Sequence, residues 1–243
     1  MRMTKSVTLI PMILPLALAC AGYSHRGAAK ETADAYNPHI DASDFQGPVD
    51  NPYFPLIPGT VFKYVEKTRK GTSENIVEVT HDTKVILGVT CVVVSDKVTK
   101  DGELEEDTFD WYAQDKEGNV WYFGEDTKEY GRNGKVSTKG SWEAGISGGQ
   151  PGIIMTGHPA VGDPYRQEYC KGAAEDMGQI VALNDPVTVP YGAFTDCVKT
   201  KEWSLLDTGV ENKWYAKGVG LVSTRASTSD GPEVATLVSL TRP

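Results

Sequence analysis

Histidines are few in this chain, and the motifs of common metal and nucleophilic sites are missing. The four histidines are His25, His39, His81 and His158, and no two of them have the spacing of a zinc site such as H-E-x-x-H. Ser147-Gly148-Gly149 lacks the strand and helix that flank the nucleophile of a hydrolase. We therefore predict no catalytic residue, no metal site and no cofactor, and the sequence favours a protein that is not an enzyme.

Positive charge and long apolar stretches are also scarce. The chain has 24 lysines and arginines against 33 aspartates and glutamates, which gives a formal net charge of −9 at pH 7. A surface of this charge repels polyanions, so nucleic acid is not an expected partner. Beyond residue 19 no apolar run is long enough to span a bilayer, so the remainder is predicted to be soluble.

Residues 1–19 have the features of a secretory signal. Two basic residues precede an apolar run, Val7 to Ala19, that ends in small side chains. The end of the run, Leu16-Ala17-Leu18-Ala19-Cys20, resembles a bacterial lipobox, in which the cysteine is lipidated and becomes the mature N-terminus. We expect Cys20 to anchor the protein in the outer membrane or at the cell surface. Ala17-Leu18-Ala19 also fits ordinary signal cleavage, so a secreted protein is the alternative.

The rest of the chain divides into a tether and a folded domain. Residues 20–46 are small and polar without periodicity, which predicts a flexible tether. Residues 47–243 are predicted to form the domain. Cys91 and Cys197 occupy similar places in Val-rich stretches and could pair in an oxidising compartment, whereas a buried free thiol is the alternative for each of them and for Cys170.

The domain shows an internal repeat. Trp111-Tyr112-Ala113 recurs as Trp214-Tyr215-Ala216, an offset of 103 residues. The same offset relates four further pairs: Gly59 and Gly162, Phe62 and Tyr165, Val77 and Ile180, and Asp82 and Asp185. A constant offset predicts a duplication, with repeat one at 58–143, a glycine-rich connecting loop at 144–160 and repeat two at 161–243.

Short stretches of alternating polarity, separated by turn signals, fill both repeats. Glu74 to Thr80 alternates with period two, and Asp101-Gly102 is a hairpin signal. The best helix candidate, Lys171 to Met177, is short. The pattern predicts an all-β fold of two tandem repeats of curved antiparallel sheet that form a barrel or a sandwich.

Two motifs resemble those of a known family. Val187-Thr188-Val189-Pro190-Tyr191-Gly192-Ala193-Phe194 is similar to a V-x-V-P-x-G-x-F-x-x-C strand–turn–strand, and Trp214 to Val222 resembles a W/Y-Y-A-x-G-V-G-L-V hairpin. Both motifs resemble those of uncharacterised bacterial secreted proteins and lipoproteins with a half-barrel sheet like that of lipoprotein carriers. The resemblance spans Pro58 to Arg225, and Lys217 departs from it where proline is common. It implies an envelope location and a concave β surface, and it supplies no catalytic residues.

The leading interpretation is an extracytoplasmic lipoprotein that binds a small apolar or amphipathic ligand, or an envelope protein, on a concave β surface. Neighbouring Trp and Tyr side chains on a strand face opposite sides, so one of each pair can line that surface. The glycine-rich loop could cover it as a lid. The predicted ligand-binding residues are Trp111, Trp142, Met155 and Trp214.

Two other functions remain open. A hydrolase or lyase that acts on envelope glycans would use paired carboxylates such as Glu143, Glu168 and Glu175. A purely structural envelope protein would need no site. The acidic run from Asp101 to Asp110 is interpreted as a solvated hairpin tip, with a weak calcium site as the alternative.

Overall fold

The computed structural model describes residues 36–131, 134–228 and 231–243, so the predicted signal segment and Cys20 lie outside the described residues. Fifteen strands form one antiparallel sheet, which confirms the prediction of an all-β fold. The one helical element of the described residues is the 3-10 turn η1 (Ala42–Asp44). No described helix has the length and apolar character to cross a membrane.

The strands fall into two runs along the chain. The first run is β1 (Val61–Thr68), β2 (Gly71–Ile86), β3 (Val89–Lys100), β4 (Glu103–Gln114), β5 (Val120–Tyr130), β6 (Val136–Ser137), β7 (Trp142–Glu143) and β8 (Gln150–Met155). The second run is β9 (Tyr165–Arg166), β10 (Glu168–Tyr169), β11 (Asp176–Val189), β12 (Gly192–Ser204), β13 (Val210–Ala216), β14 (Gly220–Thr228) and β15 (Gly231–Thr241).

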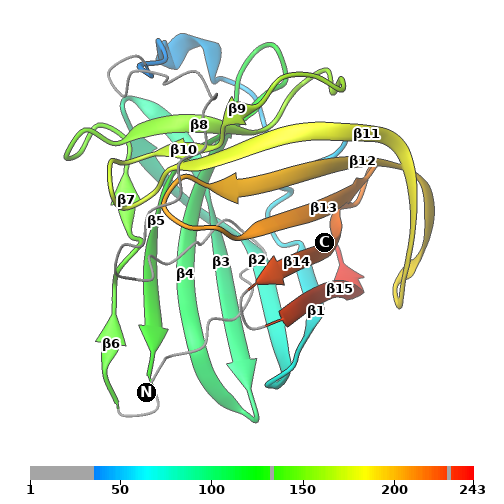
Figure 1. Ribbon diagram of the computed structural model, residues 1–243. Coiled ribbons are helices and arrows are strands. Elements are labelled where there is room, and N and C mark those ends of the chain that lie inside the picture. The colour runs from blue at the N-terminus through cyan, green and yellow to red at the C-terminus, as the bar shows by residue number, and fades with distance from the viewer. Residues whose placement is uncertain (1–35, 132–133, 229–230) are drawn as a thin grey trace, which may run out of the picture.

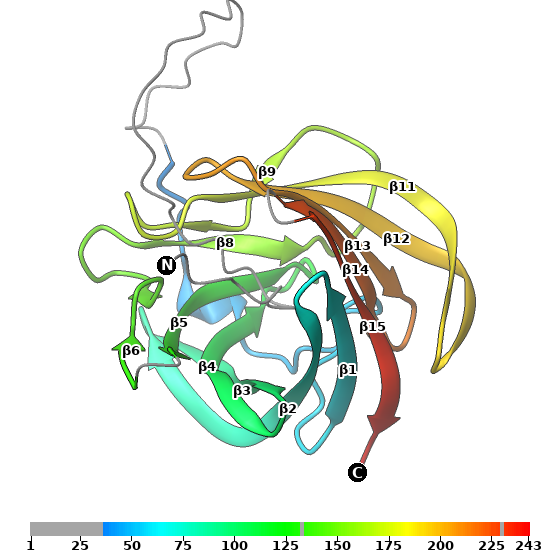
Figure 2. The same ribbon diagram turned by 60° about the horizontal axis from the view of Figure 1, so that its bottom comes forward.

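The sheet curls into a nearly closed barrel. Its strand order is β10-β8-β5-β4-β3-β2-β1-β15-β14-β13-β12-β11-β9, and β6 and β7 pair with β5. The first and last strands of the domain, β1 and β15, therefore join the two halves, which run roughly across one another (Figure 1). Residues 165–169 bridge the free edges, because Tyr165–Arg166 pairs with β11 and Glu168–Tyr169 pairs with β8. Figure 2 shows the resulting curvature.

The two halves share a layout. Strands β1 to β5 lie side by side in chain order, and so do β9 and β11 to β14. Trp111 on β4 and Trp214 on β13 each precede a register shift against the next strand. Strands β2 and β11 are single long strands with irregular registers. The internal duplication stays a prediction, which this parallel layout supports.

The N-terminal segment packs on the barrel. Phe45 is 8% exposed, and its ring meets that of Phe123 edge-on at 5.7 Å between centroids. The hydroxyl of Tyr36 donates a hydrogen bond of 2.9 Å to the carbonyl of Pro151. The prediction of a flexible tether is therefore wrong for residues 36–46. One aromatic anchor in a polar stretch gives no periodic signal, so composition alone suggests a tether.

Two further predictions need correction. Within the connection predicted as a loop, Gln150–Met155 forms strand β8, because β5 offers it a free edge that the sequence does not reveal. The helix candidate at Lys171 to Met177 is a turn followed by the start of β11.

The cysteines of the described residues are free. Cys91 and Cys197 are buried and Cys170 is half-buried. The pairing of Cys91 with Cys197 is therefore wrong, because β3 and β12 lie in different halves of the sheet with five strands between them. Burial raises the pKa of the Cys91 thiol to about 12, which keeps it protonated and unreactive.

Candidate functional site

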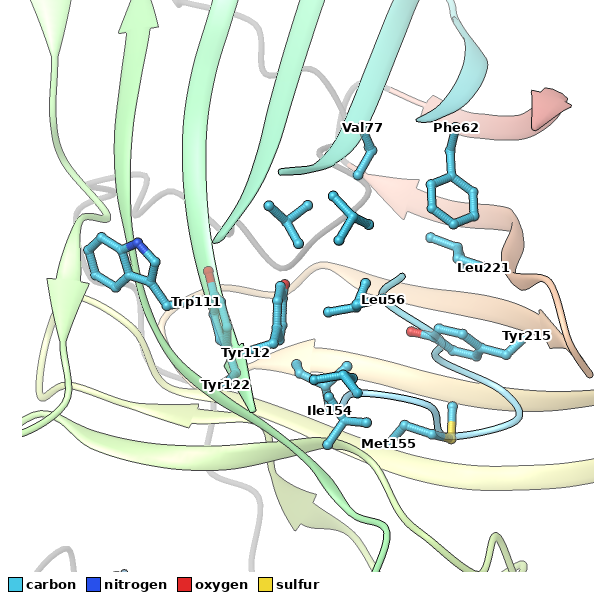
Figure 3. Close-up of a cluster of buried hydrophobic side chains, with 14 of the residues drawn as sticks. Leu56, Phe62, Val77, Trp111, Tyr112, Tyr122, Ile154, Met155, Tyr215 and Leu221 are labelled. Atoms are coloured by element: carbon cyan, nitrogen blue, oxygen red, sulfur yellow. The ribbon is translucent and has the colours of Figure 1, made fainter. Parts of the chain in front are cut away.

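The barrel interior changes from apolar to charged along its length. Every second residue of a strand faces inward, and on β4 these positions are Tyr112, Asp110, Thr108 and Glu106, all buried. The corresponding positions on β13 are Tyr215, Lys213 and Glu211. Figure 3 shows the apolar end, where Tyr112, Tyr122 and Tyr215 lie around Leu56. Polar and ionisable side chains therefore fill the other end of a closed core.

Three buried carboxyl groups lie together in the first half. Asp110 on β4 is directly opposite Glu125 on β5, and its neighbour on the other side is Val94. Asp96, two residues beyond Val94 on β3, is a diagonal neighbour of Asp110 on the same face. Asp96 and Asp110 are 0% exposed and Glu125 is 4% exposed. Like charges directly opposite each other destabilise a sheet, so packing alone does not explain this arrangement.

These carboxyl groups have unused acceptor atoms. The side-chain amide of Asn75 donates a hydrogen bond to Oδ1 of Asp96, and Oδ2 has no hydrogen-bond partner. The hydroxyl of Tyr122 donates a hydrogen bond of 2.6 Å to Oδ1 of Asp110, whose Oδ2 also has none. The hydroxyl of Tyr112, stacked 4.9 Å from the ring of Tyr122, is buried without a partner as well. Buried polar atoms without partners are rare in folded proteins, so these atoms make the cluster a candidate site.

Burial shifts the ionisation of this cluster. It raises the pKa of Asp110 to about 7. The hydrogen bond from Tyr122 lowers this pKa, whereas the charge on Glu106 raises it further. Burial, followed by the charges of Asp110 and Glu106, raises the pKa of Asp96 well above its ordinary value. Burial and the charge of Asp110 do the same to Glu125. All three carboxyl groups therefore keep their protons to a higher pH than ordinary carboxyl groups do.

The second half holds carboxylates together with a cation. The ammonium of Lys213 lies 2.7 Å from Oε2 of Glu202 and 2.9 Å from Oε1 of Glu211. The hydroxyl of Thr200 donates a further hydrogen bond of 2.6 Å to Oε1 of Glu202. Burial lowers the pKa of Lys213, but the two carboxylates outweigh it and raise that pKa above its ordinary value. Lys213 therefore stays charged inside the barrel.

A third group of side chains lies near the closure of the barrel. The indole N–H of Trp142 on β7 donates a hydrogen bond of 2.8 Å to Oε2 of Glu168 on β10. The Trp142 ring meets that of Tyr122 edge-on, with 5.6 Å between centroids. Burial and the charge of Asp176 raise the pKa of Glu168, and burial raises that of Asp176 to about 7. The polar interior thus continues from the first half to the second.

An apolar cavity adjoins the carboxyl groups. Its volume is about 40 Å³. Its lining consists of Phe54, Pro55, Leu56, Phe62, Tyr64, Val77, Val94, Gly220 and Leu221. Val94 is directly opposite Asp110, and Val77 is directly opposite Asp96. The cavity and the carboxyl cluster are therefore neighbours on the same strands.

The structure brings two of the four predicted ligand-binding residues to the interior. Trp142 reaches the polar groups, and Met155 on β8 is fully buried in the apolar cluster shown in Figure 3. The ring of Trp111 faces away from Tyr112, with the ammonium of Lys84 at 3.4 Å from its centroid. Trp214 donates a hydrogen bond of 2.9 Å to Asp185 and lies under Lys199 and Arg225. A ligand role for these four side chains stays a prediction.

The carboxylates named for a glycan hydrolase have different surroundings. Glu143 forms an ion pair of 2.7 Å with Lys84 beside Trp111. Glu175 accepts a hydrogen bond of 2.8 Å from the backbone of Gly172 in a turn. Glu168 alone faces the polar interior.

Sequence reasoning missed the interior carboxyl groups. The acidic run from Asp101 to Asp110 was interpreted as one solvated tip, but Glu106 and Asp110 are buried while Asp101 and Glu103 are exposed. The available signal was the spacing of Glu106, Thr108 and Asp110, because residues two apart on a strand share one face. In the described part of the chain no group of three or more carboxylate, imidazole or thiol side chains has the arrangement of a metal site.

Fold and site together define an all-β, nearly closed barrel with a polar, carboxyl-rich interior. No protein-family model matches the chain, and no curated protein matches it. Two solved structures are similar. One is a protein from Bacteroides fragilis NCTC 9343 assigned as exported, with a YmcC-like fold, at 16% identity and a TM-score of 0.46 over 78% of this chain and 99% of that chain. The other is a protein from Parabacteroides distasonis ATCC 8503 assigned as a lipoprotein, at 16% identity and a TM-score of 0.47 over 79% of this chain and 99% of that chain.

Proposed function

We propose that this protein is a non-enzymatic extracytoplasmic binding protein that holds a small amphipathic ligand inside its barrel. The observation that carries the proposal is that two residues lining an apolar cavity, Val77 and Val94, are directly opposite Asp96 and Asp110, whose carboxyl groups have unpartnered acceptors. Ligand sites combine an apolar lining with a few polar groups that orient the ligand. Anchoring through a lipid at Cys20, in the outer membrane or at the cell surface, belongs to the same proposal, with secretion as the alternative.

The cavity limits the size of the apolar part. A volume of about 40 Å³ accommodates roughly three water-sized probes, so the cavity takes only part of a six-carbon chain without rearrangement. A larger group needs the segment with Phe54 and Leu56 to move. That segment covers the cavity, and the ring of Phe54 lies 5.4 Å from that of Tyr112 and 6.1 Å from that of Tyr215. The segment thus contacts both halves of the barrel and covers the proposed site.

A methyl-labelled NMR titration with hexan-1-ol tests the proposal. The methyl groups of Leu56, Val94 and Leu221 line the cavity, and their resonances should shift in a saturable way. Val77→Phe fills the cavity and should abolish these shifts. Ile76→Phe is the matched control, because Ile76 is the next residue on β2, faces the other side and is 41% exposed. Absence of saturable shifts at the cavity methyls, or equal shifts in Val77→Phe, would refute the proposed function.

A hydrolase acting on envelope glycans is the second candidate. It is favoured by the raised pKa of Glu168 beside Asp176, since a general acid must be protonated at neutral pH. Incubation with purified peptidoglycan, followed by a reducing-sugar assay, should then show a release that Glu168→Gln abolishes. A wild-type protein without release contradicts this candidate.

A further inference from the structure

The second half of the barrel shows how this interior binds an ammonium group. The Lys213 side chain is 2% exposed and brings its ammonium between Glu202 and Glu211, at 2.7 and 2.9 Å. The two carboxylates come from strands that pair directly, with Glu202 opposite Glu211. A pair of opposed carboxylates is therefore neutralised in part by a cation that the chain itself supplies.

The first half repeats one of these carboxylates, and it has another carboxyl group in place of the cation. The offset of 103 residues that relates Trp111 to Trp214 carries Asp110 onto Lys213. An offset of 106, which relates Cys91 to Cys197 on the preceding strand, carries Asp96 onto Glu202. Asp110 thus occupies the place of the built-in ammonium, directly opposite another carboxyl group, Glu125.

The unpartnered atoms at this place are acceptors. Oδ2 of Asp96, Oδ2 of Asp110 and Oδ1 of Asn75 are buried and accept no hydrogen bond. An ammonium group has three donors and no acceptor, and charge-assisted hydrogen bonds to carboxylates are about twice as strong as neutral ones. The Tyr112 hydroxyl, which is also buried without a partner, can accept a further hydrogen bond.

We infer that the proposed ligand is a small amphipathic amine, whose ammonium group binds between Asp96, Asp110 and Glu125 while its apolar part fills the adjoining cavity. This inference rests on the proposed function, because it identifies the chemistry of the same site. The ammonium takes the role in the first half that Lys213 has in the second. Because burial raises the pKa of all three carboxyl groups, binding of the cation releases protons to solvent.

Isothermal titration calorimetry with matched probes tests the inference. Hexylammonium should bind the full-length protein at pH 7 at least about tenfold more tightly than hexan-1-ol. Titrations in buffers of different ionisation enthalpy should show proton release for the amine and none for the alcohol. Hexanoate, which carries a negative charge on the same chain length, should not bind.

Variants assign the effect to the cluster. Asp110→Asn keeps the acceptor for Tyr122 and should weaken hexylammonium binding by about tenfold or more, with little effect on hexan-1-ol. Asp126→Asn removes a charge from an exposed site on β5, where the side chain is 51% exposed and pairs with Lys128, and it should change neither. Asp110→Lys places a built-in ammonium in the first half and should abolish amine binding.

The outcomes separate the two proposals. If the wild type binds hexan-1-ol and binds hexylammonium no more tightly, the inference is overturned and the proposed function stays intact. Failure of both probes to bind overturns both. Equal binding of hexanoate and hexylammonium, or a calcium ion that displaces the amine, overturns the ammonium site. The wild-type comparison needs no variant, so it stands even where Asp110→Asn does not fold.

Discussion

Asp110→Asn should reverse its effect on stability between pH 4 and pH 8. Burial raises the pKa of Asp110 from 3.8 to about 7 in the folded protein, so between these values the folded state binds a proton that the unfolded state has lost. A carboxyl group of this kind stabilises the fold fully below its unfolded pKa and loses that contribution as the pH rises through its folded pKa. The wild type should therefore become less stable from pH 4 to pH 8.

The size of this loss of stability follows from the pKa shift of Asp110. A pKa shift of roughly three units corresponds to about 4 kcal/mol at about 1.4 kcal/mol per unit. The carboxyl groups that face Asp110 are Asp96 on β3, Glu106 on its own strand, and Glu125 on β5. Their charges interact with that of Asp110, so the loss is spread over a wider pH range. Asn at this position is neutral throughout and leaves a buried N–H without a partner, which costs about 1–3 kcal/mol.

The variant should thus be less stable than the wild type by about 1–3 kcal/mol at pH 4, where the carboxyl group is neutral, and more stable by about 1–3 kcal/mol at pH 8, after the wild type has lost about 4 kcal/mol. Urea unfolding followed by tryptophan fluorescence at both pH values measures this, with equal m-values as the check on two-state behaviour. Asp126→Asn, on the outer face, is the control for the change of net charge. A difference between Asp110→Asn and wild type that is the same at both pH values refutes the reasoning.

Three further changes probe other parts of the molecule. Lys213→Met leaves two carboxylates in the interior without their cation, and its free energy of unfolding at pH 7 should fall by about 3–5 kcal/mol in urea titrations. Gly152→Ala places a methyl group against the backbone of Gln167 where β8 meets residues 165–169, so thermal unfolding should move to lower temperature, whereas Gly134→Ala, in open space, has a smaller effect through backbone strain alone. Labelled palmitate should tag the wild type and not Cys20→Ser; equal labelling of both would exclude lipidation there.

The secondary structure was largely predictable because its signals are local. Alternation in Glu74 to Thr80 and the turn at Asp101-Gly102 depend only on neighbours in the sequence, and both lie where the structure has β2 and the β3–β4 turn. Strand β8 was missed because its partner edge on β5 is supplied by the fold. Phe45 was missed because a single anchor has no period.

The candidate site was only partly predictable. Trp142 and Met155 were named from aromatic and apolar content near a glycine-rich connection, and both are buried at the interior. Asp110 and Glu106 were assigned to a solvated tip because acidic residues are almost never fully buried unless paired. That statistical expectation fails in this cluster, because the fold buries its carboxyl groups although their desolvation is unfavourable.

The sequence by itself determined that this is an all-β chain, since strand alternation is a property of adjacent residues. It left open which face of each strand lies inside, because a period of two is the same for both faces. Only the tertiary structure decided that question. Closure of the sheet through residues 165–169 turns Asp96, Asp110 and Glu125 inward beside an apolar cavity. There, the exclusion of water makes the electrostatic interactions of these carboxyl groups much stronger than they are at a surface.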